Sequence, residues 1–441
     1  MKPKVLVISR SSWDDNNNSG NTLSNLFQKW DSESIANLYC RDGIPNNKIC
    51  TKYFRISESL IVKKILGKTK IAGLRFIKEI DQYKSITEDL KSQEIENNFY
   101  NFFRNNRWHI FLWVRELLWK TNKWKSEELK NFMLDFKPDV IYSPAYDSLY
   151  MYDLVRYANK ITKAKVVFFH CDDYASFRQY SFSPLFWINR LLLRSKIKQG
   201  VRLAAKNYCI VEEQCAVYKD IFNEDFKSLS KTGTFDAPIF KGELNYPIKI
   251  VYAGNLVYGR WQTLLKIAKA LDKINQSGVK VILNIYTGNV LPKKTLKKFE
   301  SLNSVNLMGK VSSTEIPEIL SVADILLHVE SFDYKEMLAT SLSFSTKLVD
   351  YFMAGRCILA LGWVKSGSIK YLKSKDAAII INDLTHIETL LLDLINSANK
   401  ILEYSTKAWD CGNTFHNKDK VLDDFENDLS IITSMSCITK N

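Results

Sequence analysis

The chain has 441 residues, of which 46% are apolar and 25% charged, and it carries a formal net charge of +14. This length exceeds one typical hydrophobic core, so two domains are expected, and the composition is that of a globular protein. No apolar run reaches about 18 residues, which argues against a membrane span. The cysteines include no CxxC pair, which argues against a zinc site and favours a reducing cytoplasm.

Short β-rich runs alternate with helical patterns in two successive blocks, which is typical of parallel sheets with crossover helices. In the first block the first strand, 4–9, leads into a polar loop with Gly20 and Asn21 and then a helix that starts near Leu23. The loop lacks GxGxxG, but the carboxyl end of a strand is the usual ligand position in an open α/β sheet. Further strands are expected at 34–39, 140–143, 164–169 and 206–211.

A histidine and two carboxylates follow the strand 164–169. His170 stands at the strand end, and Asp172 and Asp173 come two and three residues later. This arrangement suits proton transfer or the binding of an acceptor hydroxyl. The alternative is a core histidine satisfied by Asp172 or the backbone. Two adjacent carboxylates without further ligands make a poor cation site.

The segment 98–125 interleaves aromatic residues with lysine and arginine. Such a pattern fits a core helix whose cations reach solvent, and it also fits a helix lying in a bilayer interface. Stacking on single-stranded nucleic acid is a third interpretation, but no nucleic-acid-binding module accompanies the segment. We therefore expect no nucleic-acid partner.

The second block repeats the alternation. Region 233–247 carries two prolines and two glycines and is the natural hinge, which gives a first domain over 1–240 and a second over 241–417. A helical pattern over about 418–434 is able to pack back on the first domain. Strands are expected at 247–253, 279–286, 304–307, 323–329, 357–361 and 377–381.

Two polar turns of the second block are candidate ligand positions. Gly254 and Asn255 follow its first strand, and Arg260 opens the next helix, where a guanidinium can hold a phosphate through a fork of donors. Thr287 and Gly288 follow the second strand. The alternative for Arg260 is an ordinary solvated residue.

The stretch from Ser343 to Asp350 reads as a loop followed by a short helix. Ser345 or Thr346 is expected to cap the helix, and Lys347 adds a positive charge to its first turn, which together form an anion site suited to a diphosphate. Asp350 lies one turn further on the same face, where its carboxylate can accept hydrogen bonds from ribose hydroxyls. The alternative is a capped surface helix with an ordinary Lys347–Asp350 pair.

These residues resemble a known family. The succession Tyr252-Ala-Gly254-Asn255, Arg260, Thr287-Gly288, Ala323-Asp324 and Thr346-Lys347-Leu-Val-Asp350 looks like the donor domain of a GT-B glycosyltransferase. It is most similar to glycosyltransferase family 4 and its bacterial capsule, lipopolysaccharide and exopolysaccharide relatives. The resemblance covers roughly 248–382, and it is looser in the first half, where 19–22 and His170 carry it.

The resemblance implies an α/β protein of two Rossmann-like domains with parallel sheets facing across a cleft. The second domain would hold a nucleoside-diphosphate sugar, and the first would hold a glycan or polyprenyl-diphosphate-linked acceptor. Neither a cofactor nor a metal is implied, and transfer in this family retains the anomeric configuration.

Single positions agree with the family only in part. Arg260 stands where the family often has a lysine on the diphosphate, and Asn255 where many members have arginine. Asp350 replaces the second glutamate of a paired motif that contacts ribose. The first glutamate corresponds to Leu342 and is missing; the candidates to substitute for it are the nearby carboxylates of Glu330, Asp333 and Glu336.

The sequence thus predicts a glycosyltransferase of bacterial surface polysaccharide synthesis. His170, Arg260 and Lys347 are the expected catalytic residues; Gly20, Asn21, Asp172 and Asp173 would lie on the acceptor side. The basic charge and the aromatic segment favour a cytoplasmic protein in peripheral contact with the anionic inner face of the plasma membrane. The alternatives are a GT-B nucleotide-sugar epimerase and a non-catalytic scaffold or polyanion-binding protein.

Overall fold

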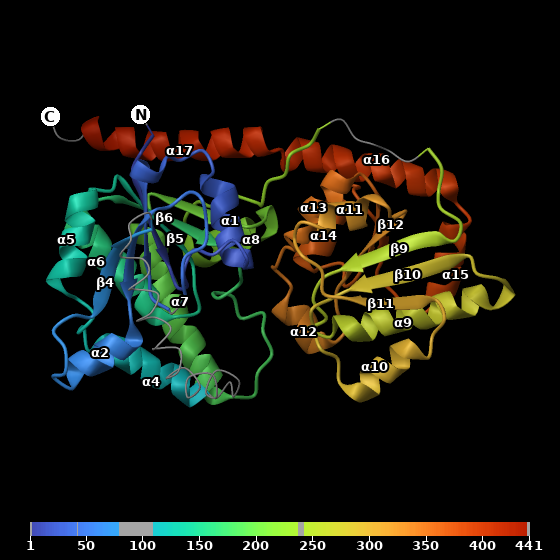
Figure 1. Ribbon diagram of the computed structural model, residues 1–441, viewed down its shortest axis with the longest axis horizontal. Helices are drawn as coiled ribbons and strands as arrows, with labels where there is room; N and C mark the ends of the chain where they lie inside the picture. Colours follow the sequence, from blue (N-terminus) through green and yellow to red (C-terminus); the bar gives the residue numbers. More distant parts are fainter. Residues whose placement is uncertain (1, 42, 79–108, 237–241, 439–441) are drawn as a thin grey trace. The chain divides into compact units, whose positions relative to one another are not determined.

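The computed structural model describes residues 2–41, 43–78, 109–236 and 242–438 (Figure 1). The chain divides into two compact units. Unit 1 comprises Met1–Phe177, Ser181–Leu229 and Leu422–Asn441, and unit 2 comprises Arg178–Tyr180 and Ser230–Val421. The main boundary therefore falls between Leu229 and Ser230, whereas the sequence placed it after residue 240.

Unit 1 is built on an eight-stranded sheet in the order β4-β3-β2-β1-β5-β6-β7-β8. All neighbouring strands run parallel except β3 and β4, which pair antiparallel. The strand order reverses between β1 and β5. The strands are β1 (Val5–Ser9), β2 (Ile35–Tyr39), β3 (Lys52–Ile56), β4 (Gly73–Ile77), β5 (Val140–Pro144), β6 (Lys165–His170), β7 (Lys206–Cys209) and β8 (Lys227–Ser228).

Helices cover both faces of this sheet. The prediction that the first helix starts near Leu23 is wrong, because the side chain of Asn17 accepts a 2.8 Å hydrogen bond from the Gly20 N–H and begins the helix five residues earlier. The helices are α1 (Asn18–Phe27), α2 (Glu58–Ile65), α4 (His109–Lys120), α5 (Glu127–Phe136), α6 (Leu149–Thr162), α7 (Pro184–Leu203) and α8 (Glu212–Phe222).

Part of the aromatic segment belongs to the core of unit 1. Trp119 and Trp124 are buried, and the Trp119 ring stacks on Tyr150 with centroids 4.1 Å apart. The core interpretation is confirmed for these two tryptophans. The aromatic residues from Phe99 to Trp108 lie outside the described residues, and the side chain of Phe111 does too.

Unit 2 contains a six-stranded sheet in the order β11-β10-β9-β12-β13-β14, and every neighbouring pair is parallel. Counted within the unit this is the order 3-2-1-4-5-6 of a Rossmann sheet, whose strand order reverses between β9 and β12. The strands are β9 (Ile248–Ala253), β10 (Val281–Tyr286), β11 (Val305–Gly309), β12 (Ile325–Val329), β13 (Cys357–Leu361) and β14 (Ile379–Ile381).

The central strands of unit 2 are apolar on both faces because helices pack on each side, which explains why β12 and β13 are buried at every position. The helices are α9 (Arg260–Ile274), α10 (Lys293–Glu300), α11 (Ile316–Ser321), α12 (Tyr334–Ala339), α13 (Lys347–Ala354), α14 (Gly367–Ser374), α15 (Ile387–Ile395) and α16 (Ala398–Phe415). The α/β class with two Rossmann-like parallel sheets is thereby confirmed.

The last helix, α17 (Lys418–Ile438), begins in unit 2 and packs on unit 1 from Leu422 onward. Its Phe425 ring lies 5.7 Å from the ring of Phe27, and Asp428 accepts hydrogen bonds of 2.7 Å from the hydroxyl of Tyr208 and the ammonium of Lys227. Throughout the part of the chain that the structure describes, every helix is too short or too polar to cross a membrane.

Candidate functional site

The candidate site lies in unit 2, at the carboxyl end of β9 and β12. Gly254 and Asn255 directly follow β9, Glu330 directly follows β12, and Arg260 opens α9. Since the strand order reverses between β9 and β12, this edge is the position at which open α/β sheets bind their ligands.

Arg260 is held by a buried carboxylate. Its Nη2 donates a 3.0 Å hydrogen bond to Oε2 of Glu330, and its Nε lies 3.2 Å from the carbonyl oxygen of Val329. Nη1 donates to Oδ1 of Asn255 at 2.8 Å. The side chains of Arg260 and Glu330 are only 12% and 5% exposed. Arg260 is therefore a fixed cation, and the alternative of an ordinary solvated arginine is wrong.

The second oxygen of Glu330 faces a buried histidine of β12. Nε2 of His328 lies 3.3 Å from Oε1 of Glu330. Burial lowers the pKa of His328, so its imidazole is neutral at pH 7. Burial alone would raise the pKa of Glu330, but His328 and Arg260 outweigh it and hold that pKa well below the usual range. The carboxylate is ionised and balances the charge of Arg260.

Lys347 brings a second cation to the same edge. Its Nζ lies 3.3 Å from the carbonyl oxygen of Ala253 and 4.4 Å from the centre of the Tyr252 ring. Burial, followed by repulsion from Arg260, lowers the pKa of Lys347 to about 7. An ammonium so poorly solvated gains more from an anionic ligand than an exposed lysine does.

Gly254 makes room for this ammonium. A Cβ on residue 254 would lie 2.2 Å from Nζ of Lys347, well inside van der Waals contact. Glycine at this position therefore permits the close approach of Lys347 to the end of β9, and its backbone conformation is not an unusual one.

The helix that carries Lys347 begins as the sequence predicts but is not capped as predicted. Thr346 occupies the N-cap position of α13 in a helical conformation, and no side chain accepts a capping hydrogen bond there. The carbonyl oxygens of Ser345 and Thr346 instead accept from the N–H groups of Leu348 and Val349. The Ser345 N–H donates to Oγ of Ser368 at 3.0 Å, which ties this turn to α14.

Asp350 has a different partner from the one considered in the sequence. Its Oδ1 accepts a hydrogen bond of 2.8 Å from Nζ of Lys231, and both side chains are partly buried. The alternative of a Lys347–Asp350 pair is wrong, because Lys347 turns toward β9.

The remaining candidates of unit 2 shape the turns around this edge. Thr287 continues β10 by donating its N–H to the Gly309 carbonyl at 2.8 Å, and Gly288 follows it. Asn289 next to them accepts the Leu256 N–H at 2.7 Å, so the turns after β9 and β10 are joined. The carbonyl of Ser343 lies so close to α14 that a Cβ on Gly367 would be 2.6 Å from it.

His170 lies in the hydrophobic interior of unit 1. Its side chain is 1% exposed, and its ring packs edge-on against Tyr218 and Phe226 at 5.3 and 5.7 Å. Burial lowers its pKa to about 3, so the imidazole is neutral. These surroundings are those of a core histidine, the alternative weighed from the sequence.

The other candidates of unit 1 support loops at the carboxyl end of its sheet. Gly20 lies against the backbone of the preceding loop, where a Cβ would be 2.0 Å from the carbonyl oxygen of Asp14, and Asn21 follows it in α1. Asp173 is buried and accepts the N–H groups of Ala175 and Ser176. Asp172 is exposed and accepts from the hydroxyl of Tyr174 at 3.1 Å.

Two further observations concern the paired-glutamate position and metal binding. Leu342, which stands in place of the first paired glutamate, is completely buried. In the described ranges of the chain, no three histidine, cysteine, aspartate or glutamate side chains are grouped so as to hold a metal ion.

Sequence reasoning identified Glu330 only as one of three carboxylates and did not identify His328. Part of the signal was present, since His328 lies in the apolar run 323–329 and Glu330 directly follows that run, at the end of an expected strand. What was missing was the adjacency of β12 and β9.

Comparison with known proteins supports the fold. No protein-family model matches the sequence, and no curated protein sequence matches it. Among solved structures, Anabaena HepE in complex with UDP is similar with a TM-score of 0.60 at 11% identity, over 97% of this chain and 99% of HepE. A second similar structure is that of a UDP-forming α,α-trehalose-phosphate synthase from Burkholderia xenovorans in complex with glucose-6-phosphate. Its TM-score is 0.58 at 10% identity, over 97% of this chain and 100% of the synthase.

These similarities extend over nearly the whole length of both neighbours. Together with the two parallel sheets they show that the fold is that of the GT-B glycosyltransferase structures. At 10–11% identity the likeness concerns the fold alone.

Proposed function

We propose that this protein is a glycosyltransferase that moves a sugar from a nucleoside-diphosphate sugar to a glycan or lipid-linked acceptor. The observation that carries the proposal is the placement of Arg260 and Lys347 at the strand-order reversal of a Rossmann sheet, where Glu330 fixes one cation and Gly254 admits the other.

The charges of the site match the chemistry of such a transfer. When the bond from the sugar to the diphosphate breaks, negative charge develops on the departing phosphate oxygen and must be stabilised. The carboxylate of Glu330 neutralises the charge of Arg260 and fixes the orientation of its guanidinium. The net positive charge that the site offers to the diphosphate is therefore that of Lys347. Arg260, Lys347 and the first turn of α13 would together stabilise the negative charge of the diphosphate, which a divalent metal ion does in other transferases.

The solved neighbours support this assignment through their ligands. HepE was crystallised with UDP, with UDP-glucose and with UDP and glucose. A nucleoside-diphosphate sugar is therefore the donor class that we assign to this chain, without a choice of base or sugar. We place synthesis of a bacterial surface polysaccharide, in the cytoplasm, as the setting that the family resemblance favours.

Retention of the anomeric configuration is the outcome that the resemblance favours, although the paired-glutamate motif is altered. Leu342 is buried and supplies no carboxylate. Asp333 accepts the N–H groups of Lys335 and Glu336 and so caps α12. Glu330 is the carboxylate closest to the cations, and we assign it the positioning of Arg260. Asp350, one turn beyond Lys347, is the proposed ribose contact.

Unit 1 would bind the acceptor through the carboxyl end of its own sheet, where the start of α1 with Gly20 and Asn21 and the exposed carboxylate of Asp172 lie. The surroundings of His170 leave it without access to a substrate, so we assign it a structural role.

The test is to incubate the protein in EDTA with UDP-, GDP-, ADP-, CDP- and dTDP-sugars and to follow release of the nucleoside diphosphate by chromatography, with water taking the sugar in place of the acceptor. Release from one donor, lost in Lys347→Ala, is the expected result. An epimerase would convert the sugar without releasing nucleotide. A scaffold would release none and would bind polyanions with a steep salt dependence.

A further inference from the structure

Unit 1 carries an unusual exposed surface that is separate in the chain from the donor site of unit 2. Three of its helices, α2, α4 and α7, expose apolar side chains to solvent although each also buries an apolar face on the core. Leu191 is 56% exposed on α7, Leu117 is 59% exposed on α4 and Leu66 is 62% exposed just after α2. Scattered exposed leucines are ordinary, but repeated ones on helices of one face need an explanation.

The clearest case is α7. Leu193 and Ile197 face the core, and Gly200 lets the helix approach the Phe168 ring, since a Cβ there would lie 3.1 Å from it. This packing fixes which side of the helix faces outward. The outward stripe is apolar in the first half of the helix, at Leu185, Ile188, Leu191 and Leu192.

The same stripe becomes basic in its second half. Lys198 and Arg202 continue it at helical spacing and are both exposed. Altogether α7 contains Arg190, Arg194, Lys196, Lys198 and Arg202 and no acidic residue, which gives a formal charge of +5.

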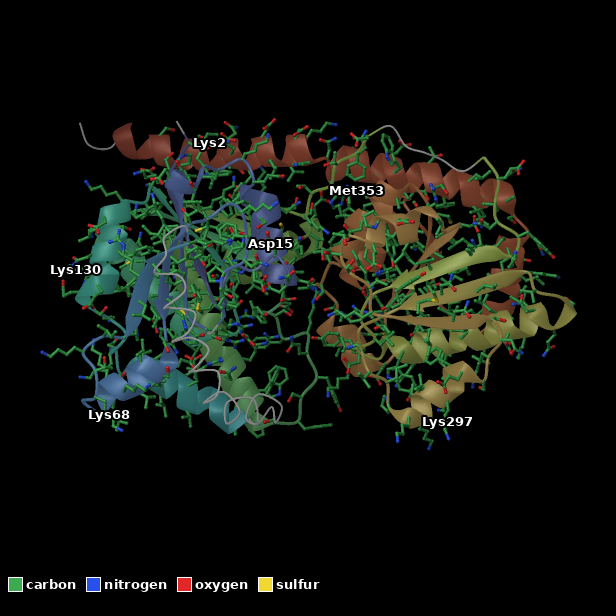
Figure 2. The ribbon with its side chains drawn as sticks, in the orientation of Figure 1. Lys2, Asp15, Lys68, Lys130, Lys297 and Met353 are labelled. Atoms are coloured by element: carbon green, nitrogen blue, oxygen red, sulfur yellow. The ribbon has the colours of Figure 1, made fainter. Side chains whose placement is uncertain are left out.

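The neighbouring helices repeat this combination. On α2, Val62 and Ile65 are exposed, and on α4 Val114 and Leu117 are exposed one turn apart. The α2 helix contacts α4, which packs on α6, and α6 packs on α7, so the helices belong to one face of unit 1 (Figure 1). Lys68 projects outward beyond the end of α2 (Figure 2).

Few of these cations are neutralised by the protein itself. Within the described residues, none of the following cations forms an ion pair: Lys63, Lys64, Lys68, Lys70, Lys120, Lys123, Lys198 and Arg202. Residues 58–70 and 113–125 each carry a formal charge of +3. Basic residues that flank exposed apolar side chains are the chemistry that binds the interface of an anionic membrane.

We propose that α2, α4 and α7 form a surface by which this protein docks on a membrane containing anionic lipid. The apolar first half of α7 enters the boundary between headgroups and acyl chains, and Lys198, Arg202 and the lysines of α2 and α4 contact lipid phosphates. This proposal does not rest on the donor site, because every residue it uses lies in unit 1.

The experiment is co-sedimentation of the full-length chain with vesicles of phosphatidylcholine alone and of phosphatidylcholine with phosphatidylglycerol, at low and high salt. We expect binding only to the anionic vesicles and weaker binding at high salt. Lys198→Ala with Arg202→Ala should weaken binding roughly 25-fold, since each basic residue near a membrane surface contributes about fivefold. Leu185→Ser, Ile188→Ser and Leu191→Ser combined should weaken it at least roughly tenfold.

Matched controls lie on unit 2. Val279→Ser with Val290→Ser, and Lys293→Ala with Lys297→Ala, change exposed residues of the same types and should bind vesicles like the wild type. Each variant is first shown to keep the wild-type melting temperature and, where the donor assay is active, nucleotide release. Absence of binding to anionic vesicles, or equal binding by α7 variants and controls, would overturn the proposal. A wild-type dimer that the leucine variant dissociates, without vesicle binding, would assign the surface to self-association instead.

Discussion

Arg260 and Glu330 form a buried ion pair in which Nη2 of the guanidinium lies 3.0 Å from Oε2 of the carboxylate. The pair joins the first residue of α9 to the residue that follows β12, on either side of the strand-order reversal. It keeps the guanidinium at the carboxyl edge of the sheet before any ligand arrives, which is the preorganisation that electrostatic catalysis requires.

Removal of either cation should slow turnover strongly and leave the fold intact. Arg260→Ala and Lys347→Ala each remove a charge that stabilises the departing diphosphate, so kcat should fall by about 10²–10³-fold. The measurement is nucleoside-diphosphate release under saturating donor. Lys297→Ala, on the exposed side of α10 (Figure 2), is the matched control and should stay at the wild-type rate. Full activity in both site variants would refute the assignment.

Glu330→Gln should act through Arg260. The amide keeps the shape of the carboxylate but leaves the partly buried guanidinium without its counter-charge, so unfolding free energy should fall by about 1–3 kcal/mol. A merely structural role would change stability alone. A positioning role also lowers kcat. Compared with Glu330→Gln, Glu330→Asp should recover more of the lost stability than of the lost kcat, because the shorter side chain holds the guanidinium further back. Stability loss with unchanged kcat would contradict the positioning role.

Binding of a nucleoside diphosphate above pH 7 should take up a proton. The pKa of Lys347 is lowered to about 7, so below that pH the ammonium already exists, and above it the free protein holds a neutral amine. A bound diphosphate favours the charged form, and affinity should therefore weaken as pH rises from 7 to 9. Calorimetry at pH 8 in two buffers of different ionisation enthalpy should report ~0.9 proton per site. Lys347→Met should report almost none; equal uptake by that variant would exclude Lys347 as the titrating group.

Gly254→Ala should disturb Lys347 more than it disturbs the fold. The new methyl group would lie 2.2 Å from Nζ, which is the flexible end of its side chain and can move away. We expect nucleotide affinity to fall at least roughly tenfold with little change in melting temperature. Gly242→Ala, which meets no atom within 4 Å, is the control. Unchanged affinity in Gly254→Ala would show that the position of Lys347 next to Ala253 is unimportant.

Much of the fold follows from local patterns. The strand expected at 357–361 coincides with β13, because five consecutive apolar residues after Gly355 have no other place than the centre of a parallel sheet. The strands β3 and β4 were missed. In β3 the buried Arg55 interrupts the apolar run, and β4 is a half-exposed edge strand whose pairing is antiparallel.

The site was predictable as far as single residues are concerned. Glycine after a strand, arginine at a helix start and lysine in a first turn are local signals, and all three residues lie at the expected edge. Their partners were not predictable, because the paired residues are far apart in the sequence. Lys231 and Asp350 are separated by 119 residues, and Arg260 and Glu330 by 70. Such pairs depend on which strands are neighbours, and no local pattern encodes that.

The most direct test of the central claim is calorimetric titration of the wild-type protein and Lys347→Ala with UDP, GDP, ADP, CDP and dTDP in EDTA. We expect that one nucleoside diphosphate binds the wild type without metal and that the variant loses this binding. Binding of none of them, or equal binding by the variant, would contradict the assignment of Arg260 and Lys347 to a diphosphate.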